Sequence, residues 1–183
     1  MIVDFCLGRG LNRLPNQSDG AQFFRVETRY LDPDVNAFVG MLTTLTRFNQ
    51  VLIQPDPISP NSGLFVWNWG ADIGIVRGAH LWELDLMGVS LGERLAFGPA
   101  IAGEHTLFKP LKFYHRTMID MFVGSTLLDS NQGLEWFPWQ SVGLTLGYRI
   151  FAAKKMLNRD GPCASLIWRF QNPKIPFLFP SMG

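Results

Sequence analysis

The sequence predicts a mainly β (α+β) fold, an antiparallel sandwich or barrel that also carries one or two amphipathic helices. Three observations predict it. Apolar and polar residues alternate in several segments, two further segments place apolar residues at spacings of three and four, and proline-rich stretches separate the elements. With 183 residues the chain is long enough for one sizeable core, so we expect residues 1–183 to form a single domain.

Three segments alternate with the period of a β-strand that has one polar face. They are residues 23–30 (FFRVETRY), 141–150 (SVGLTLGYRI) and 165–171 (SLIWRFQ). Side chains of a strand point to opposite faces in turn, so in each segment the apolar set lies on one face. We expect that face to pack into the core and the polar face, for example Arg25 and Glu27, to meet water.

Residues 63–92 also alternate, but the apolar phase changes within the segment. Phe65, Trp67 and Trp69 share one side, and Trp82, Leu84 and Leu86 share one side, but after Gly88 the apolar set becomes Val89, Leu91, Leu95 and Phe97. A shift of one residue inverts the faces of a strand, so we expect a bulge or tight bend near Met87 and Gly88.

Two segments have the apolar spacing of an amphipathic helix. The first covers residues 34–50, where Asp32 and Pro33 are a plausible N-cap and first helical residue. The second covers residues 115–127. The apolar stripes comprise Val35, Phe38, Val39, Leu42, Leu45 and Phe48 in the first helix, and Met118, Ile119 and Phe122 in the second.

Prolines mark a loop and a tail. Residues 54–63 (QPDPISPNSG) contain three prolines and predict a rigid, exposed connection. Residues 172–183 (NPKIPFLFPSMG) surround Phe177, Leu178 and Phe179 with prolines, which a central strand does not accept. We expect this segment to run as an extended C-terminal arm along a surface.

The composition indicates a chain whose surface is covered by other subunits. Charged residues make up only 17% of the chain, and it contains 15 Phe and 6 Trp. The net charge of +1 disfavours a general nucleic-acid binder, so no nucleic-acid partner is predicted.

The start of the chain lacks the basic and long apolar regions of a secretory signal, and no stretch is apolar enough for a transmembrane helix. Two cysteines, Cys6 and Cys163, are too few for a disulfide framework; they form one bridge or remain two buried thiols.

No recognised pattern of catalytic, cofactor-binding or metal-binding residues is present. The three histidines, His80, His105 and His115, lack the spacing that places two ligands on one helical face, and no serine stands in a nucleophile elbow. No cofactor is therefore predicted, and a non-catalytic role is favoured. An enzyme that uses residues scattered along the sequence stays an alternative.

Residues 108–116 (FKPLKFYHR) are the best candidate for contact with an anion, because basic and aromatic side chains interleave there. The alternative is an edge strand with a solvated basic side. The candidates are Lys109, Lys112, His115 and Arg116.

Taken together, these features favour a structural or assembly subunit of a large complex, such as a virus or phage particle, located in a virion. Its partners would be other protein subunits in an oligomer. An outer-membrane-type β-barrel and a soluble barrel for a hydrophobic ligand are the alternatives. The interface candidates are Trp67, Trp69, Trp82, Trp136, Phe137, Trp139, Phe177, Leu178 and Phe179.

Overall fold

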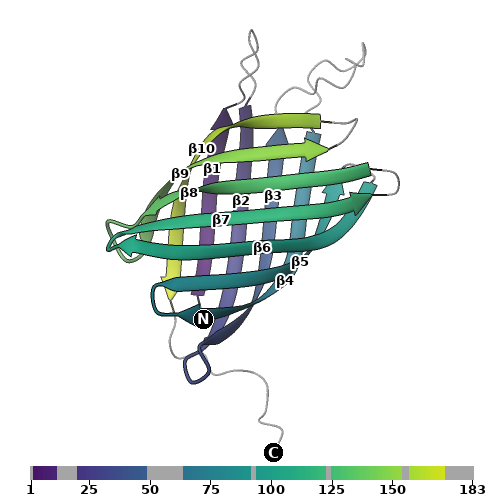
Figure 1. Ribbon diagram of the computed structural model, residues 1–183. Helices are drawn as coiled ribbons and strands as arrows, with labels where there is room; N and C mark the ends of the chain where they lie inside the picture. Colours follow the sequence, from purple (N-terminus) through teal and green to yellow (C-terminus); the bar gives the residue numbers. More distant parts are fainter. Residues whose placement is uncertain are drawn as a thin grey trace, which may run out of the picture.

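The computed structural model is a closed barrel of ten antiparallel strands (Figure 1). It describes residues 2–11, 20–48, 64–91, 94–122, 125–153 and 157–171. The strands are β1 (Ile2–Leu11), β2 (Gly20–Asp32), β3 (Ala37–Phe48), β4 (Leu64–Arg77), β5 (His80–Leu91), β6 (Arg94–Phe108), β7 (Leu111–Phe122), β8 (Ser125–Trp136), β9 (Val142–Ala153) and β10 (Leu157–Gln171).

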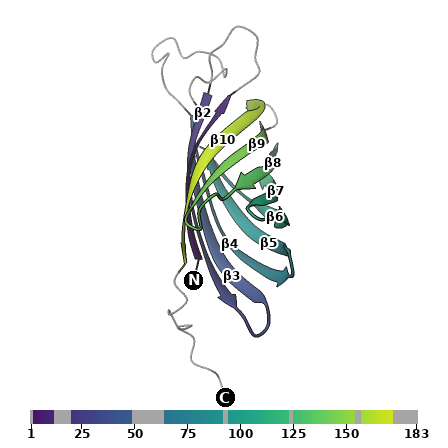
Figure 2. The ribbon, with the colours of Figure 1, turned by 90° about the vertical axis from the view of Figure 1, so that its left-hand side faces the viewer.

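Each strand pairs with the strands before and after it in the sequence, and β1 closes the barrel by pairing with β10. The barrel is flattened, so that β1–β3 form a wall that crosses behind β6–β8 at a steep angle (Figures 1 and 2). Because the two walls face each other at short range, interior side chains of β2 can meet those of β5–β7.

The two ends of the barrel differ in their connections. Residues 33–36, 78–79, 109–110 and 137–141 form the turns at one end, where β1 also begins and β10 ends. We call this the turn end. The strands are joined at the opposite end, which we call the loop end, by residues 12–19, 49–63, 92–93, 123–124 and 154–156, all outside the described residues.

Local chemistry explains two of the turns. The backbone N–H of Asp34 donates to Oδ1 of Asp32 at 2.9 Å, and Asn36 adopts a φ of 51°. Asn tolerates this left-handed conformation better than most residues. Gly78 has a φ of 61° in the two-residue turn between β4 and β5, which suits glycine for the same steric reason.

The predicted helices are wrong. Residues 37–48 of the first form β3, and the second falls on β7 and the start of β8. In β3, Phe38 and Leu42 point into the barrel while Val39 and Leu45 point outward, so both faces carry apolar side chains. Apolar residues on both faces of a strand produce spacings of three and four, which imitate a helix. Among the described residues no helix is long and apolar enough to span a bilayer.

The bulge predicted near Met87 and Gly88 is also wrong. The register of β5 continues without a shift against both β4 and β6. Met87 and Val89 point inward on the same face as Glu83 and Asp85. The apolar residues change parity in the sequence because the inward-facing residues of this regular strand change from acidic to apolar along its length.

The expectation of a mainly β barrel is thus confirmed, without the helices. The proline-rich loop at residues 54–63 and the arm at residues 172–183 lie outside the described residues.

Candidate functional site

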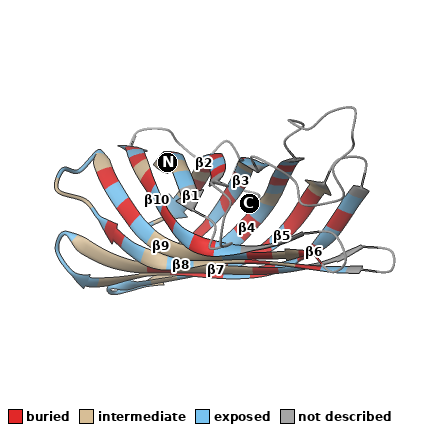
Figure 3. Cartoon of the chain, turned by 90° about the horizontal axis from the view of Figure 1, so that it is seen from above, coloured by how far each residue is buried: buried red, intermediate tan, exposed pale blue. Residues whose placement is uncertain are grey.

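The outer face of the barrel is apolar along the middle of its strands. Leu86 of β5 and Leu146 of β9 are 68% and 69% exposed, and Met41, Ile73 and Ile101 are likewise exposed. Along most strands these exposed residues alternate with buried ones (Figure 3). Soluble monomers rarely present apolar surface on such a scale, so this face must be covered by something other than water.

Most aromatic and charged residues on the outer face lie toward the strand ends, although Trp69 stands near the middle of β4. All six tryptophans are exposed, from 37% for Trp69 and Trp168 to 68% for Trp139. Arg47 and Arg77 are exposed and stand within one residue of the end of their strands. An aliphatic middle with aromatic and charged margins is the distribution that a bilayer with two interfaces favours.

The interior carries the charges. Three segments predicted as strands, residues 23–30, 141–150 and 165–171, fall within β2, β9 and β10, but their faces are inverted relative to the expectation. Glu27 and Arg29 point into the barrel, while Phe24 is exposed.

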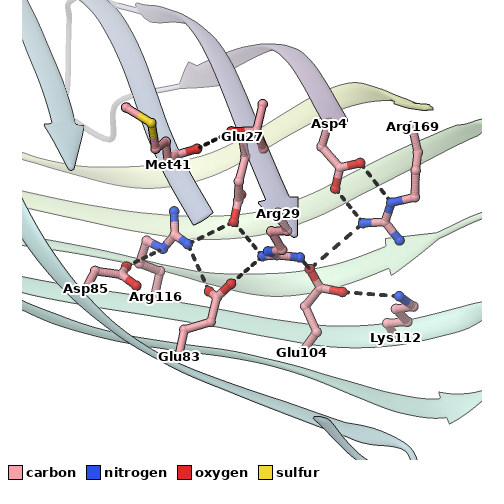
Figure 4. A network of polar contacts seen from close by, with 11 residues as sticks. Asp4, Glu27, Arg29, Met41, Glu83, Asp85, Glu104, Lys112, Arg116 and Arg169 are labelled. Carbon is pink, nitrogen blue, oxygen red and sulfur yellow. Dashed lines mark hydrogen bonds and ion pairs between the residues drawn. The ribbon is translucent and has the colours of Figure 1, made fainter. Parts of the chain in front are cut away.

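Arg29 is the centre of a buried network that joins the two walls of the barrel (Figure 4). Its Nη2 lies 2.5 Å from Oε1 of Glu27 on its own strand and 2.7 Å from Oε1 of Glu83 on β5. Its Nη1 donates to Oε1 of Glu104 on β6 at 2.8 Å. One guanidinium therefore ties three strands together, as its planar fork of donors allows.

Arg116 of β7 is a second guanidinium in the same network. Its Nη2 donates to Oε2 of Glu83 at 2.9 Å, and its Nε lies 3.3 Å from Oδ2 of Asp85. Ala102 stands directly between Glu83 and Arg116 in the register. Its small side chain leaves room for Arg116 to reach back over β6 to the acids of β5.

Further arginine–carboxylate pairs extend the network on both sides. Arg169 of β10 donates from Nε and Nη2 to Asp4 of β1 at 2.8 and 2.6 Å, across the strand pair that closes the barrel. Toward the loop end, Arg149 binds Asp129 in the same bidentate way at 2.8 and 2.6 Å. Lys112 reaches Glu104 at 3.1 Å.

Three buried carboxylates of the network approach one another closely. Glu27, Asp72 and Glu83 each place an oxygen within 4.8 Å of the others. Arg29 and Arg116 take the space around Glu27 and Glu83, so these two acids are already paired with guanidinium ions, whereas neither carboxylate oxygen of Asp72 has a hydrogen-bond partner among the described residues. The carboxylate of Asp72 lies against Gly40, in the space that a Cβ at this position would occupy.

Apolar side chains form two buried clusters in the remainder of the interior that the structure describes. Toward the loop end the interior residues include Val66, Val89, Leu127 and Phe151, all at most 1% exposed. Phe137, in a connection at the turn end, packs against the buried cluster of Cys6, Phe23, Cys163 and Ile167, and its ring centroid lies 4.6 Å from the Arg169 guanidinium. Both cysteines are free thiols.

A cavity of about 60 Å³ remains in the interior. Ligand pockets measure about 300–1,000 Å³, so this cavity does not provide the apolar chamber that the soluble-carrier alternative requires.

The structure separates the residues predicted to contact an anion. Lys112 and Arg116 point inward to carboxylates, His115 lies on the outer face, and Lys109 is exposed in a turn. Of the interface candidates, Trp67, Trp69, Trp82, Trp136 and Trp139 are exposed and Phe137 is partly buried, while Phe177, Leu178 and Phe179 lie outside the described residues.

The sequence interpretation missed the buried network altogether. Its signal was present in the alternation itself: the polar face of β2 reads Arg25, Glu27, Arg29, and that of β5 reads Glu83, Asp85. When the polar faces of two strands both point into a closed sheet, the arginine residues of one strand can form ion pairs with the acids of the other.

An apolar exterior around a charged, filled interior defines the class: a β-barrel of inverted polarity. No family model and no curated protein matches the chain. Similar solved structures include the KdgM porin with oligogalacturonate (8% identity, 93% of this chain and 100% of that one, TM-score 0.46). They also include an outer membrane channel from Pseudomonas putida (8%, 92% and 92%, 0.45) and an OmpT loop-deletion mutant from Vibrio cholerae (10%, 87% and 57%, 0.43).

The chain spans 57% and 61% of two of these similar proteins, OmpT and the DcaP channel of Acinetobacter baumannii. At such low identity and TM-score the comparisons define no family, and the assignment rests on the geometry of the chain itself.

The interpretation as a virion or assembly subunit is wrong, and so is the virion location. The physical reason lies in the two faces of the barrel. A subunit covered by protein neighbours would still keep an apolar core and place its charges outside, whereas this chain buries its ion pairs and exposes its leucines and tryptophans.

Proposed function

We propose that the chain is an integral β-barrel of the outer-membrane type, with a lumen closed by its own side chains. The observation that carries the proposal is the inversion of polarity: Glu27, Arg29 and Glu83 are at most 6% exposed, whereas Leu86 and Leu146 are exposed by more than two thirds. In hydrocarbon this distribution is favourable, because lipid tails cover the leucines and the closed sheet satisfies the backbone.

The dimensions of the strands support the same conclusion. They contain 10 to 15 residues, and a tilted strand needs about 9–11 to cross a bilayer. An even number of antiparallel strands is the rule for single-chain bacterial barrels.

The turns suggest an orientation. Bacterial barrels have short turns in the periplasm and longer loops outside the cell. The turn end, with connections such as residues 78–79 and 109–110, would therefore face the periplasm, and the loop end would face outward.

The filled lumen favours a closed barrel over a general diffusion pore. Salt bridges from β2 to β5 and β6 cross the interior, and Phe137 occupies the turn-end mouth. The small cavity, which residues such as Leu42, Met87 and Arg149 line, holds at most a few water molecules. We therefore assign the chain a role as a membrane-embedded scaffold or anchor.

Refolding tests this proposal. Diluted from urea, the chain should fold into phospholipid vesicles but not into buffer alone, and the folded form should migrate differently on a gel before and after heating. Because all six tryptophans are exposed, lipids brominated along their chains should quench most of the fluorescence of the folded protein. Folding to a stable species in buffer without lipid, with no quenching by brominated lipid, would overturn the proposal.

A further inference from the structure

The three histidines of the chain meet on the outer face at the turn end. His80 is the first residue of β5, His105 lies near the end of β6, and His115 lies in β7. His80 and His105 are direct partners in the register, and His115 is the partner of Gly103, two residues before His105. Strand pairing thus gathers onto one surface three imidazoles that are up to 35 residues apart.

The ring nitrogens face one another at short distances. Nδ1 of His80 and Nδ1 of His105 are 3.1 Å apart, and Nε2 of His105 and Nε2 of His115 are 3.3 Å apart. Two nitrogens bound to one tetrahedral zinc ion at 2.0–2.1 Å lie about 3.3–3.4 Å from each other. The Nε2 pair of His105 and His115 therefore has the separation of two ligands of the same ion.

The surroundings keep this pair open. Gly103 lies beneath it, and a Cβ there would stand 2.8 Å from Nε2 of His115 and 3.3 Å from Nε2 of His105. Trp82 packs beside the rings, with its centroid 4.5 Å from that of His105. His80 is exposed next to the turn at residues 78–79, so ions from the aqueous side can reach the cluster.

We propose that His105 and His115 bind a divalent transition-metal ion of the zinc class through their Nε2 atoms, and that His80 positions His105. A neutral imidazole carries one N–H, and a ligating histidine commonly donates it from the nitrogen that does not bind the metal. In the tautomer that we propose, Nδ1–H of His105 donates to Nδ1 of His80, which leaves the Nε2 lone pair of His105 directed at the ion. Water completes the coordination.

Calorimetric titration of the refolded, tag-free protein with Zn²⁺ tests the proposal. We expect one ion per chain. His105→Ala and His115→Ala should each weaken binding by more than about 100-fold, since each removes a ligand. His80→Ala should weaken it by about 10–100-fold, the range for a residue that orients a ligand, and His80→Gln, which retains an acceptor, should restore much of the affinity.

The outcome of the titration distinguishes a metal site from three surface histidines that do not bind a common ion. Equal, small losses in all three alanine variants, or no measurable binding of Zn²⁺ by the parent, would overturn the proposal. Bound Zn²⁺ should also raise the urea midpoint of the parent and of His80→Gln but not of His115→Ala. A failure to bind Zn²⁺ can be distinguished from a failure of the proposed membrane role, because refolding and lipid quenching are measured without metal.

Discussion

Replacement of Arg116 by Met should lower the free energy of unfolding by about 3–5 kcal/mol, the usual cost of removing one partner from a buried ion pair. Arg116 faces Glu83 at 2.9 Å and Asp85 at 3.3 Å, and both acids are at most 5% exposed. Methionine retains most of the length of the side chain but none of its charge, so the two carboxylates would be left with less compensation in the barrel interior. Urea titration of the protein in vesicles measures the loss.

Two variants make this result specific. Arg77→Met changes an exposed arginine at a strand end and should alter stability by no more than about 0.5 kcal/mol. Adding Glu83→Gln and Asp85→Asn to Arg116→Met should recover more than half of the loss, because the uncompensated charges are then removed. If Arg116→Met costs no more than Arg77→Met, the ion pairs of Arg116 with Glu83 and Asp85 do not stabilise the barrel.

The same network shows what alternation in a sequence can and cannot predict. Period-two patterning correctly located β2, β9 and β10, because successive side chains of a strand point to opposite faces in any solvent. It does not say which face is inside. Assigning Phe24 to the core and Glu27 to water assumed an aqueous surrounding, and the structure places them the other way round.

The helix errors have a related cause. In a barrel with an apolar exterior and a partly apolar interior, some strands carry apolar residues on both faces, as Phe38 and Val39 do on adjacent positions of β3. Apolar and polar residues then no longer alternate along the strand, so its sequence lacks the period of two that identifies a strand. Closure of the sheet, which brings Arg169 of β10 to Asp4 of β1, depends on pairing between the ends of the chain and has no local signal.

The histidine cluster could not be predicted from the sequence either. Spacings of 25 and 10 residues between His80, His105 and His115 match no helical motif, and only the register of β5, β6 and β7 brings the rings together. Metal-ligand patterns read along a sequence detect sites within one helix or loop, whereas cross-strand sites require knowledge of strand pairing.

Leu86→Arg should destabilise the barrel in lipid by about 2–4 kcal/mol, whereas Leu107→Arg should cost about 0–1 kcal/mol. Both leucines are exposed, at 68% and 56%, but Leu86 lies in the middle of β5 and Leu107 one residue from the end of β6. Arginine at mid-strand must enter hydrocarbon, while arginine near the strand end can reach the headgroups. Urea titrations in the same vesicles compare the two variants. On a water-soluble surface both substitutions would be close to neutral, so equal, small effects would exclude a bilayer around the middle of the strands.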